Sequence, residues 1–321
     1  MDASPDTTMD DGGPFGRPLF NDPAMQYLSR VGVVDVGSNS VRLVIFDGAA
    51  RSPAYFYNEK IMAALGAGVQ ETGRLNPLGR KRALWAIRRF QMLAETLKLA
   101  PLTAVATAAV RDATDGPEFC QEIERETGLK LHVIPGEEEA RLSAQGVLLG
   151  WPDASGLVCD IGGSSMELAA LTNGKVGACE TSPLGPLHLQ AIKSKAARKT
   201  HIAEVIDGLA NRMGARQERL YLVGGSWRAI ARLDMERRNY PLHVMHEYRM
   251  TSKSVKETVN WIAEHELEDL REMTGISEAR MALVPLACEV LRALLRRLKP
   301  HEIAISSYGI REGMLYEQMP D

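Results

Sequence analysis

Two short stretches with the same strand-turn-strand pattern constrain the fold of this chain more than any other feature of its sequence. The first, VVDVGSNSVRL at residues 33–43, is a hydrophobic run, a polar turn and a second hydrophobic run. The second, VCDIGGSSMEL at 158–168, lies 125 residues later. The gapless alignment pairs Asp35 with Asp160, Gly37 with Gly162, Ser40 with Ser165 and Leu43 with Leu168. A repeat on this scale predicts two related domains.

The regions that follow each repeat have the alternating helix and strand patterns of an α/β fold. In the first half, a β-rich run precedes the helical stretch RKRALWAIRRFQMLAETLKL, the strand TAVATAAV and a helix that begins near Glu137. The second half repeats this order and closes with a helix over 278–298, the strand EIAIS and the short helix GIREGMLYEQM. Residues 1–29 are rich in Asp, Pro, Gly and Met without periodicity, so we expect a disordered tail.

Composition excludes several classes of protein. The net charge is −3, so a generally basic, specific nucleic-acid binder is not expected. No stretch has the eighteen or so consecutive apolar residues of a membrane span, and none of the four cysteines belongs to a CxxC pair. The seven histidines form no HExxH or comparable metal motif. We therefore expect a cytoplasmic protein without a membrane partner.

The two polar turns predict an anion site. Glycine-centred turns expose backbone N–H groups, and hydroxyl and amide side chains add further donors. Asp35 and Asp160 end the preceding strands, where each could hold Mg²⁺ directly or through water. A single such turn is more often a plain hairpin connection, but two in the same register favour phosphate binding. The expected phosphate-binding residues are Gly37, Ser38, Asn39, Ser40, Gly162, Gly163, Ser164 and Ser165.

Six motifs occur in the order seen in the exopolyphosphatase and guanosine-pentaphosphate phosphatase family, which this chain resembles from about residue 30 onward. They are DVGSNSVRL, ATAAVRDATDG, VIPGEEEARLSAQGV, DIGGSSMEL, YLVGGSWRAIARL and SSYGIREGML. The family usually has three glycines and a threonine in the fourth motif, whereas this chain has Gly162, Gly163, Ser164 and Ser165. The two serines keep the hydroxyl donors, so phosphate binding is expected to survive.

The resemblance implies the short form of an actin-like fold related to sugar kinases and ribonuclease H. We expect two α/β domains, each with a mixed β-sheet, and a cleft between them. Domain I would comprise residues 30–136 and 309–321, and domain II residues 137–308. The resemblance also implies a homodimer.

The resemblance implies that two glutamates flank the reacting phosphate, and they match Glu139 and Glu167. Glu139 is the expected general base, with Glu138 as the alternative, because consecutive helical residues diverge by about 100° and only one can face the cleft well. Glu167 would orient water or share a metal, Mg²⁺ or Mn²⁺, with Asp160. Asp35 is the third expected metal ligand.

Arginines complete the expected site. Arg111 would contact phosphate oxygens, as would Arg42, for which a structural ion pair is the alternative. Two basic runs could follow a long polyanion, although such runs are more often solvated faces. They are Arg80, Lys81, Arg82, Arg88 and Arg89 in one helix, and Lys193, Lys195, Arg198 and Lys199 in another segment.

Together these features predict a hydrolase that releases terminal orthophosphate from inorganic polyphosphate. The main rival hypothesis is hydrolysis of the 5′-phosphate of guanosine pentaphosphate, and the residues do not decide between the two substrates. An ATP-dependent kinase of the same superfamily and a catalytically silent sensor are less favoured hypotheses. Glu139 together with GSNSVRL favours hydrolysis over a kinase, and the presence of both glutamates argues against a silent sensor.

Overall fold

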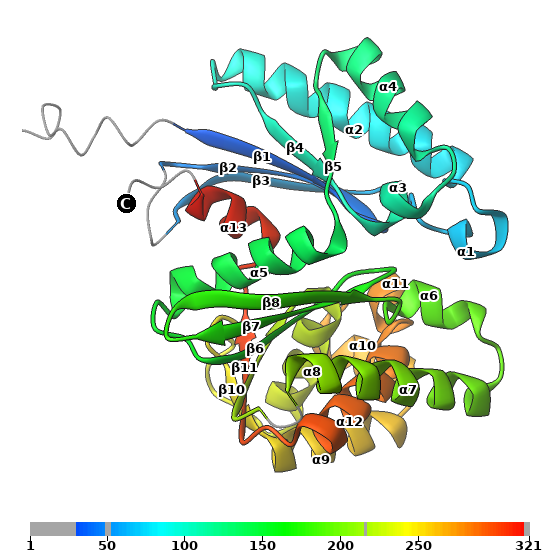
Figure 1. Ribbon diagram of the computed structural model, residues 1–321, viewed down its shortest axis with the longest axis vertical. Helices are drawn as coiled ribbons and strands as arrows, with labels where there is room; N and C mark the ends of the chain where they lie inside the picture. The colour runs from blue at the N-terminus through cyan, green and yellow to red at the C-terminus, as the bar shows by residue number, and fades with distance from the viewer. Residues whose placement is uncertain (1–29, 49–52, 215–216, 318–321) are drawn as a thin grey trace, which may run out of the picture.

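The computed structural model describes residues 30–48, 53–214 and 217–317, and the predicted tail lies outside them. Two β-sheets stand one above the other, each with helices of its own, and helices α5 (Gly136–Gly150) and α13 (Ile310–Tyr316) lie between them (Figure 1). This is the predicted α/β arrangement of two mixed sheets.

The upper sheet of Figure 1 has five strands in the order β3-β2-β1-β4-β5. Its strands are β1 (Val31–Val36), β2 (Ser40–Phe46), β3 (Tyr55–Met62), β4 (Thr103–Ala106) and β5 (Leu131–Val133). The helices of this half are α1 (Val69–Thr72), α2 (Pro77–Thr96), α3 (Ala108–Asp112) and α4 (Gly116–Thr127). Apolar residues of α2 and α4, such as Phe90 and Phe119, pack on Val34 and Leu43 of the sheet.

The lower sheet has six strands in the order β10-β11-β9-β6-β7-β8. Its strands are β6 (Gly156–Ile161), β7 (Met166–Thr172), β8 (Lys175–Ser182), β9 (Arg219–Val223), β10 (Arg249–Thr251) and β11 (Glu302–Ser306). The helices of this half are α6 (Pro186–Ala191), α7 (Lys195–Met213), α8 (Gly225–Arg237), α9 (Ser252–Ala263), α10 (Leu267–Thr274), α11 (Glu278–Met281) and α12 (Val284–Leu298).

The sequence repeat is a structural repeat. In β1 and β2, Asp35 lies opposite Arg42, and in β6 and β7 Asp160 lies opposite Glu167 in the same antiparallel register. Each turn closes with the same backbone hydrogen bond, from glycine N–H to serine carbonyl, over 3.0 Å: Gly37 to Ser40, and Gly162 to Ser165. The duplication inferred from the residues therefore extends to the geometry of the turns.

Helices α5 and α13 cross at very close range and join the two halves. A Cβ atom on Gly313 would lie 1.8 Å from the Leu142 carbonyl oxygen, and one on Gly146 would lie 2.2 Å from the Gly309 carbonyl oxygen. Only glycine permits this approach of the two backbones. Apolar residues of α13 pack under β1 and β2, whereas α5 packs on the lower sheet.

Two element predictions were wrong in detail. The predicted strand TAVATAAV ends at Ala106, and helix α3 begins at Ala108, so Arg111 lies on a helix rather than after a strand. The predicted helix over 278–298 is broken between Met281 and Val284 into α11 and α12.

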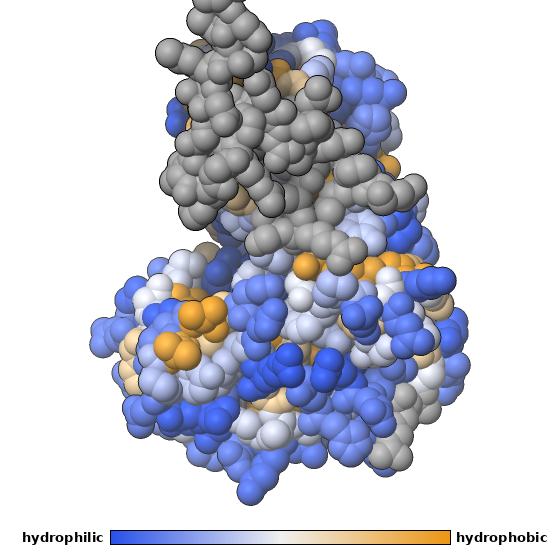
Figure 2. Space-filling model, turned by 90° about the vertical axis from the view of Figure 1, so that its left-hand side faces the viewer, coloured by the Kyte–Doolittle hydropathy of each residue, from blue (hydrophilic) through white to orange (hydrophobic). Residues whose placement is uncertain are grey.

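In the described part of the chain, no helix has the length and apolar character to cross a membrane. Hydrophilic side chains dominate the lower half on the face shown in Figure 2.

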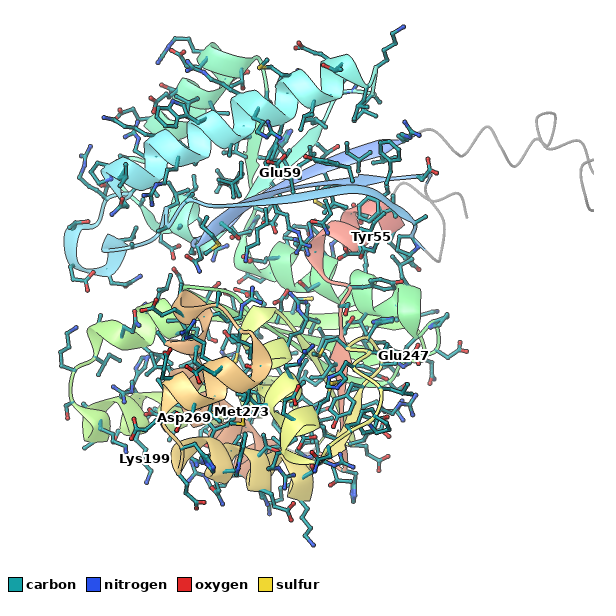
Figure 3. All side chains as sticks on the ribbon, turned by 180° about the vertical axis from the view of Figure 1, so that it is seen from behind. Tyr55, Glu59, Lys199, Glu247, Asp269 and Met273 are labelled. Carbon is teal, nitrogen blue, oxygen red and sulfur yellow. The ribbon has the colours of Figure 1, made fainter. Side chains whose placement is uncertain are left out.

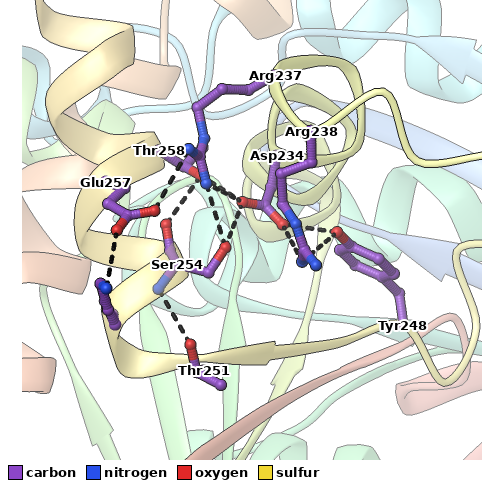
Figure 4. A network of polar contacts seen from close by, with 9 residues as sticks. Asp234, Arg237, Arg238, Tyr248, Thr251, Ser254, Glu257 and Thr258 are labelled. Carbon is purple, nitrogen blue, oxygen red and sulfur yellow. Dashed lines mark hydrogen bonds and ion pairs between the residues drawn. The ribbon is translucent and has the colours of Figure 1, made fainter.

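A buried aspartate organises the polar packing of α8 against α9. Asp234 is fully buried and accepts hydrogen bonds from the hydroxyls of Tyr248, over 2.6 Å, and Ser254, over 2.9 Å, and from Thr258 (Figure 4). Arg237 and Arg238 supply positive charge at 3.2 and 3.4 Å. These hydrogen bonds lower the pKa of Asp234 despite its burial.

Candidate active site

A cavity of about 630 Å³ opens where the two repeated turns approach each other. Both halves of the molecule contribute to its walls, as expected for a cleft between two domains. Eleven of the predicted site residues line it: Asp35, Gly37, Ser38, Asn39, Ser40, Arg42, Glu139, Asp160, Gly162, Gly163 and Ser165.

The two turns are in direct contact at the cavity floor. The Ser164 hydroxyl donates to the Ser38 hydroxyl over 3.0 Å, which joins the halves by a buried hydrogen bond. A Cβ atom on Gly163 would lie 3.0 Å from Ser38 Cβ, so the turn leaves little room for a side chain. Ser164 is buried in this contact and, unlike its neighbours, is not part of the cavity wall.

Glu139 is the one of three consecutive glutamates that reaches the cavity. It lies in the first turn of α5 and is buried, whereas Glu137 is exposed and Glu138 accepts a 2.7 Å hydrogen bond from Arg141. Burial raises the pKa of Glu139, and the nearby Asp160 and Asp35 raise it further. Arg111 lowers this pKa, because its Nη1 lies 3.2 Å from a Glu139 carboxylate oxygen.

Arg111 and Glu167 stand behind Glu139 rather than in the cavity wall. Arg111 Nη1 also donates to the Ile134 carbonyl over 3.2 Å. Glu167 is fully buried and accepts from the Thr181 hydroxyl over 3.0 Å, while its other oxygen has no hydrogen-bond partner among the described residues. Burial, followed by the charge of Glu139, raises the pKa of Glu167 well above its usual range.

The two equivalent aspartates have different partners. Arg311 Nη1 lies 3.6 Å from an oxygen of Asp35, and the Ser143 hydroxyl donates to Asp160. Burial raises the pKa of both carboxyls, and the charge of Asp35 raises that of Asp160 further.

The predicted set of three metal ligands does not assemble. Over residues 30–48, 53–214 and 217–317, no group of three or more His, Cys, Asp or Glu side chains is placed to hold a metal ion. Asp35 and Asp160 line the cavity, but Glu167 is held behind it by Thr181. The expectation that Glu167 shares a metal with Asp160 stays a prediction.

Sequence reasoning missed most of the positive charge of the site. Besides Arg42, the cavity is lined by Lys60, Arg228, Arg280 and Arg311. Burial, with Arg311 and Arg280 nearby, lowers the pKa of Arg228 to about 10, which leaves this side chain charged at neutral pH. Arg228 and Arg311 belong to motifs already recognised, SWRAIARL and GIREG, whereas no sequence signal marks Lys60 or Arg280.

The wall of the cavity near Arg311 is fixed by a carboxylate. Glu312 is buried, accepts a hydrogen bond from the Gly309 N–H over 2.8 Å and another from the Tyr55 hydroxyl over 2.8 Å. Tyr55 lies beside α13 in Figure 3, so this contact links β3 to the start of α13. Glu312 thereby holds the turn that presents Arg311 to Asp35.

Comparisons with known proteins agree on the family. Residues 44–321 match the Ppx/GppA phosphatase family. Exopolyphosphatase 1 of Mycobacterium tuberculosis is 25% identical over 304 residues, covering 90% of this chain and 88% of that protein. A guanosine-5′-triphosphate,3′-diphosphate pyrophosphatase of Photobacterium profundum is 27% identical over 304 residues, covering 89% of this chain and 58% of that protein.

Solved structures show the same fold. A crystal structure of an exopolyphosphatase from Cytophaga hutchinsonii has a TM-score of 0.80 at 22% identity, covering 90% of this chain and 97% of that one. The Ppx/GppA family member of Aquifex aeolicus has a TM-score of 0.75 at 24% identity, covering 90% of this chain and 97% of that one. The expected family and fold class are confirmed, and this chain belongs to the Ppx/GppA phosphatase family.

Proposed function

We propose that this protein is an exopolyphosphatase that hydrolyses the terminal phosphoanhydride of inorganic polyphosphate. The observation that carries the proposal is the cavity itself, which is lined by five cationic side chains, by the two facing turns and by the buried Glu139. A polyphosphate chain carries negative charge along its whole length, and charge-assisted hydrogen bonds from arginine match phosphate oxygens well. The names of the mycobacterial and Cytophaga relatives support the same substrate.

The geometry supports the following roles for the residues of the site. Backbone N–H groups and hydroxyls of the two turns, with Arg42, would hold the terminal phosphate. Glu139 would take a proton from the attacking water, since a base with a raised pKa accepts a proton readily near neutral pH. Arg111 would keep part of the Glu139 population ionised and orient its carboxylate. Glu167, whose raised pKa favours its protonated form, would be the second carboxyl of the site and would orient water beside Glu139.

A divalent cation fits the two aspartates. Mg²⁺ is commonly held by one or two carboxylates, with substrate phosphates and water as its other ligands. Asp35 and Asp160 provide two such carboxylates in the cavity, so a preformed group of three protein ligands is not required. When bound, Mg²⁺ or Mn²⁺ would neutralise charge on the transferred phosphoryl group. The proposal also includes a cytoplasmic location and a homodimer, which rest on composition and on the family resemblance.

Guanosine pentaphosphate is the second candidate substrate, because the Photobacterium relative is named for a guanosine substrate. A guanine base needs an apolar or aromatic surface for stacking. Tyr55 is the only aromatic side chain among the described residues that line the cavity, and its hydroxyl is engaged by Glu312. This composition favours the inorganic chain.

Orthophosphate release from the two substrates with Mg²⁺ tests the proposal. We expect release from polyphosphate, and a fall in kcat of at least about 10²-fold in Glu139→Gln. Glu137→Gln is the matched control, because Glu137 is an exposed acid in the same helical turn. Faster release from guanosine pentaphosphate would favour the second candidate. Release from neither substrate, or full activity of Glu139→Gln, would refute the proposed function.

A further inference from the structure

The end of domain II away from the cavity carries a second groove, of about 1030 Å³, that no step of hydrolysis uses. It lies between the start of α9 and the connection from α12 to β11. Within the described part of the chain, its lining includes no Asp or Glu side chain. The lining residues are Ser252, Lys256, Arg292, Leu295, Arg296, Arg297, Lys299, Pro300 and His301.

From these residues we infer that the groove is a second binding site for the distal part of a long polyphosphate chain. This inference rests on the proposed function, because it assigns a second contact to the same substrate. Among the described residues, no ion pair involves Lys256, Arg296 or Lys299, whereas Arg297 pairs with Asp207 at 2.7 Å. Like charges that line one groove without acidic partners repel one another, and a polyanion would relieve that repulsion.

The local sequence departs from ordinary helix chemistry at this groove. Acidic residues are favoured in the first turn of a helix, but α9 has none there and instead carries Lys253, with Lys256 close behind. Lys299 adopts a left-handed conformation with φ 49°, at a helix end where glycine is the usual residue. Arg296 and Arg297 at the end of α12 suit the helix dipole, but the lysines of α9 oppose it. Such departures are expected where a site serves binding.

The groove suits a phosphate chain better than a nucleic acid. Proteins that bind single-stranded nucleic acid combine positive charge with aromatic side chains on which bases stack. The groove has the charge but no Phe, Tyr or Trp among the described residues that line it. Inorganic polyphosphate has no bases and needs only the charge.

Two elements connect the groove to the cavity and give the distance between them. Leu283, which precedes α12, and Ser307, which follows β11, both line the cavity, whereas the opposite ends of these elements reach the groove. Helix α12 has 15 residues and spans about 22 Å, and β11 has 5 residues and spans about 17 Å. Only a chain long enough to cover about 20 Å can contact both sites, so tripolyphosphate cannot.

The test compares chain lengths. In the combined variant Lys256→Gln, Arg296→Gln and Lys299→Gln, we expect KM for long-chain polyphosphate to rise about tenfold. We expect kcat, and both constants for tripolyphosphate, to stay unchanged. The matched control removes three exposed lysines elsewhere, by Lys98→Gln, Lys130→Gln and Lys175→Gln, and should leave KM for the long chain unchanged.

Three kinetic results would overturn the inference: an unchanged KM for the long chain in the groove variant, an equal rise for tripolyphosphate, or an equal effect of the control variant. Dissociation constants measured with the Glu139→Gln protein separate this inference from the proposed function. The wild-type protein could release no orthophosphate and the inference would still be testable. The groove site is then supported if Glu139→Gln binds long-chain polyphosphate more tightly than the protein that carries Glu139→Gln and the groove substitutions together. Binding of single-stranded nucleic acid in preference to polyphosphate would refute it.

Discussion

Replacement of Arg111 by glutamine is expected to move the acidic limb of the pH profile to higher pH. As the proposed general base, Glu139 would have to be ionised to accept a proton from water, and burial already raises its pKa above the ordinary glutamate value. Arg111 opposes this shift, because its positive charge favours the ionised carboxylate. Without that charge the pKa rises further, so a smaller fraction of Glu139 is ionised at any pH on the acidic side.

The magnitude follows from the contact. Arg111 Nη1 and Glu139 Oε2 are 3.2 Å apart, and the two side chains are only 21% and 11% exposed, so water screens their attraction weakly. An opposite charge at such a distance shifts a carboxyl pKa by about 1–3 units. Each unit corresponds to about 1.4 kcal/mol of preference for the ionised form. We therefore expect the acidic limb of kcat/KM to rise by about 1–3 pH units in Arg111→Gln.

The assay is orthophosphate release from tripolyphosphate, measured as kcat/KM between about pH 5 and pH 9. Arg111→Lys keeps the charge and should shift the limb less than Arg111→Gln. Arg125→Gln is a control for charge alone, since Arg125 is 67% exposed and does not line the cavity. If Arg111 only binds phosphate, KM will rise while the limb stays in place. A limb that stays in place or moves to lower pH would refute the electrostatic reasoning.

Two further predictions concern stability, measured by urea denaturation. Gly146→Ala should lower the free energy of unfolding by about 1–3 kcal/mol, because the new methyl group collides with the backbone where α5 crosses α13. The control is Gly208→Ala, which should be neutral or stabilising because only the flexible end of an arginine lies near its new methyl group, 3.5 Å away. Equal effects of the two would contradict this. Asp234→Asn should cost about 2 kcal/mol or more near neutral pH, and Asp269→Asn, at an exposed site, almost nothing. The pKa of Asp234 is lowered in the folded state, so the ionised carboxylate stabilises the fold above that pKa. The difference in free energy of unfolding between the wild type and Asp234→Asn should therefore shrink as the pH falls through that pKa. A difference that persists in strong acid would be evidence against the charge-based explanation.

The parts of the site that could be predicted are those with a local pattern. Each turn follows a hydrophobic strand and ends in a second one, so its place and register follow from periodicity alone. The sequence does not fully decide which of the three consecutive glutamates faces the cavity. Helical geometry shows that only one of them can face it well, but not that this one is Glu139. The structure resolves this, since Glu138 is turned to Arg141.

Apart from Arg42, the cations of the cavity could not be predicted in the same way. Lys60 lies on β3 and Arg280 on α11, more than two hundred residues apart, and only the packing of the two halves of the molecule brings them to one cavity. A lone lysine or arginine is usually a surface residue, so its type alone carries no signal. Ser143 was within reach of sequence reasoning: it is four residues after Glu139 and shares its helix face, which places its hydroxyl against Asp160.

The repeat also explains how one strand-turn-strand unit can serve two purposes in the same protein. At the position opposite the repeated aspartate, the first unit has Arg42 and the second has Glu167. Arg42 lines the cavity, where the proposed function gives its charge a phosphate to attract, while Glu167 is buried near Glu139, does not line the cavity and has a pKa raised well above its usual range. A cation at the second position would lower the pKa of Glu139 and weaken it as a base, and an acid at the first would repel the substrate. Under the proposed function, the cation at this position in the first unit therefore serves substrate binding, whereas the carboxyl at the same position in the second unit lies close to the proposed base on α5.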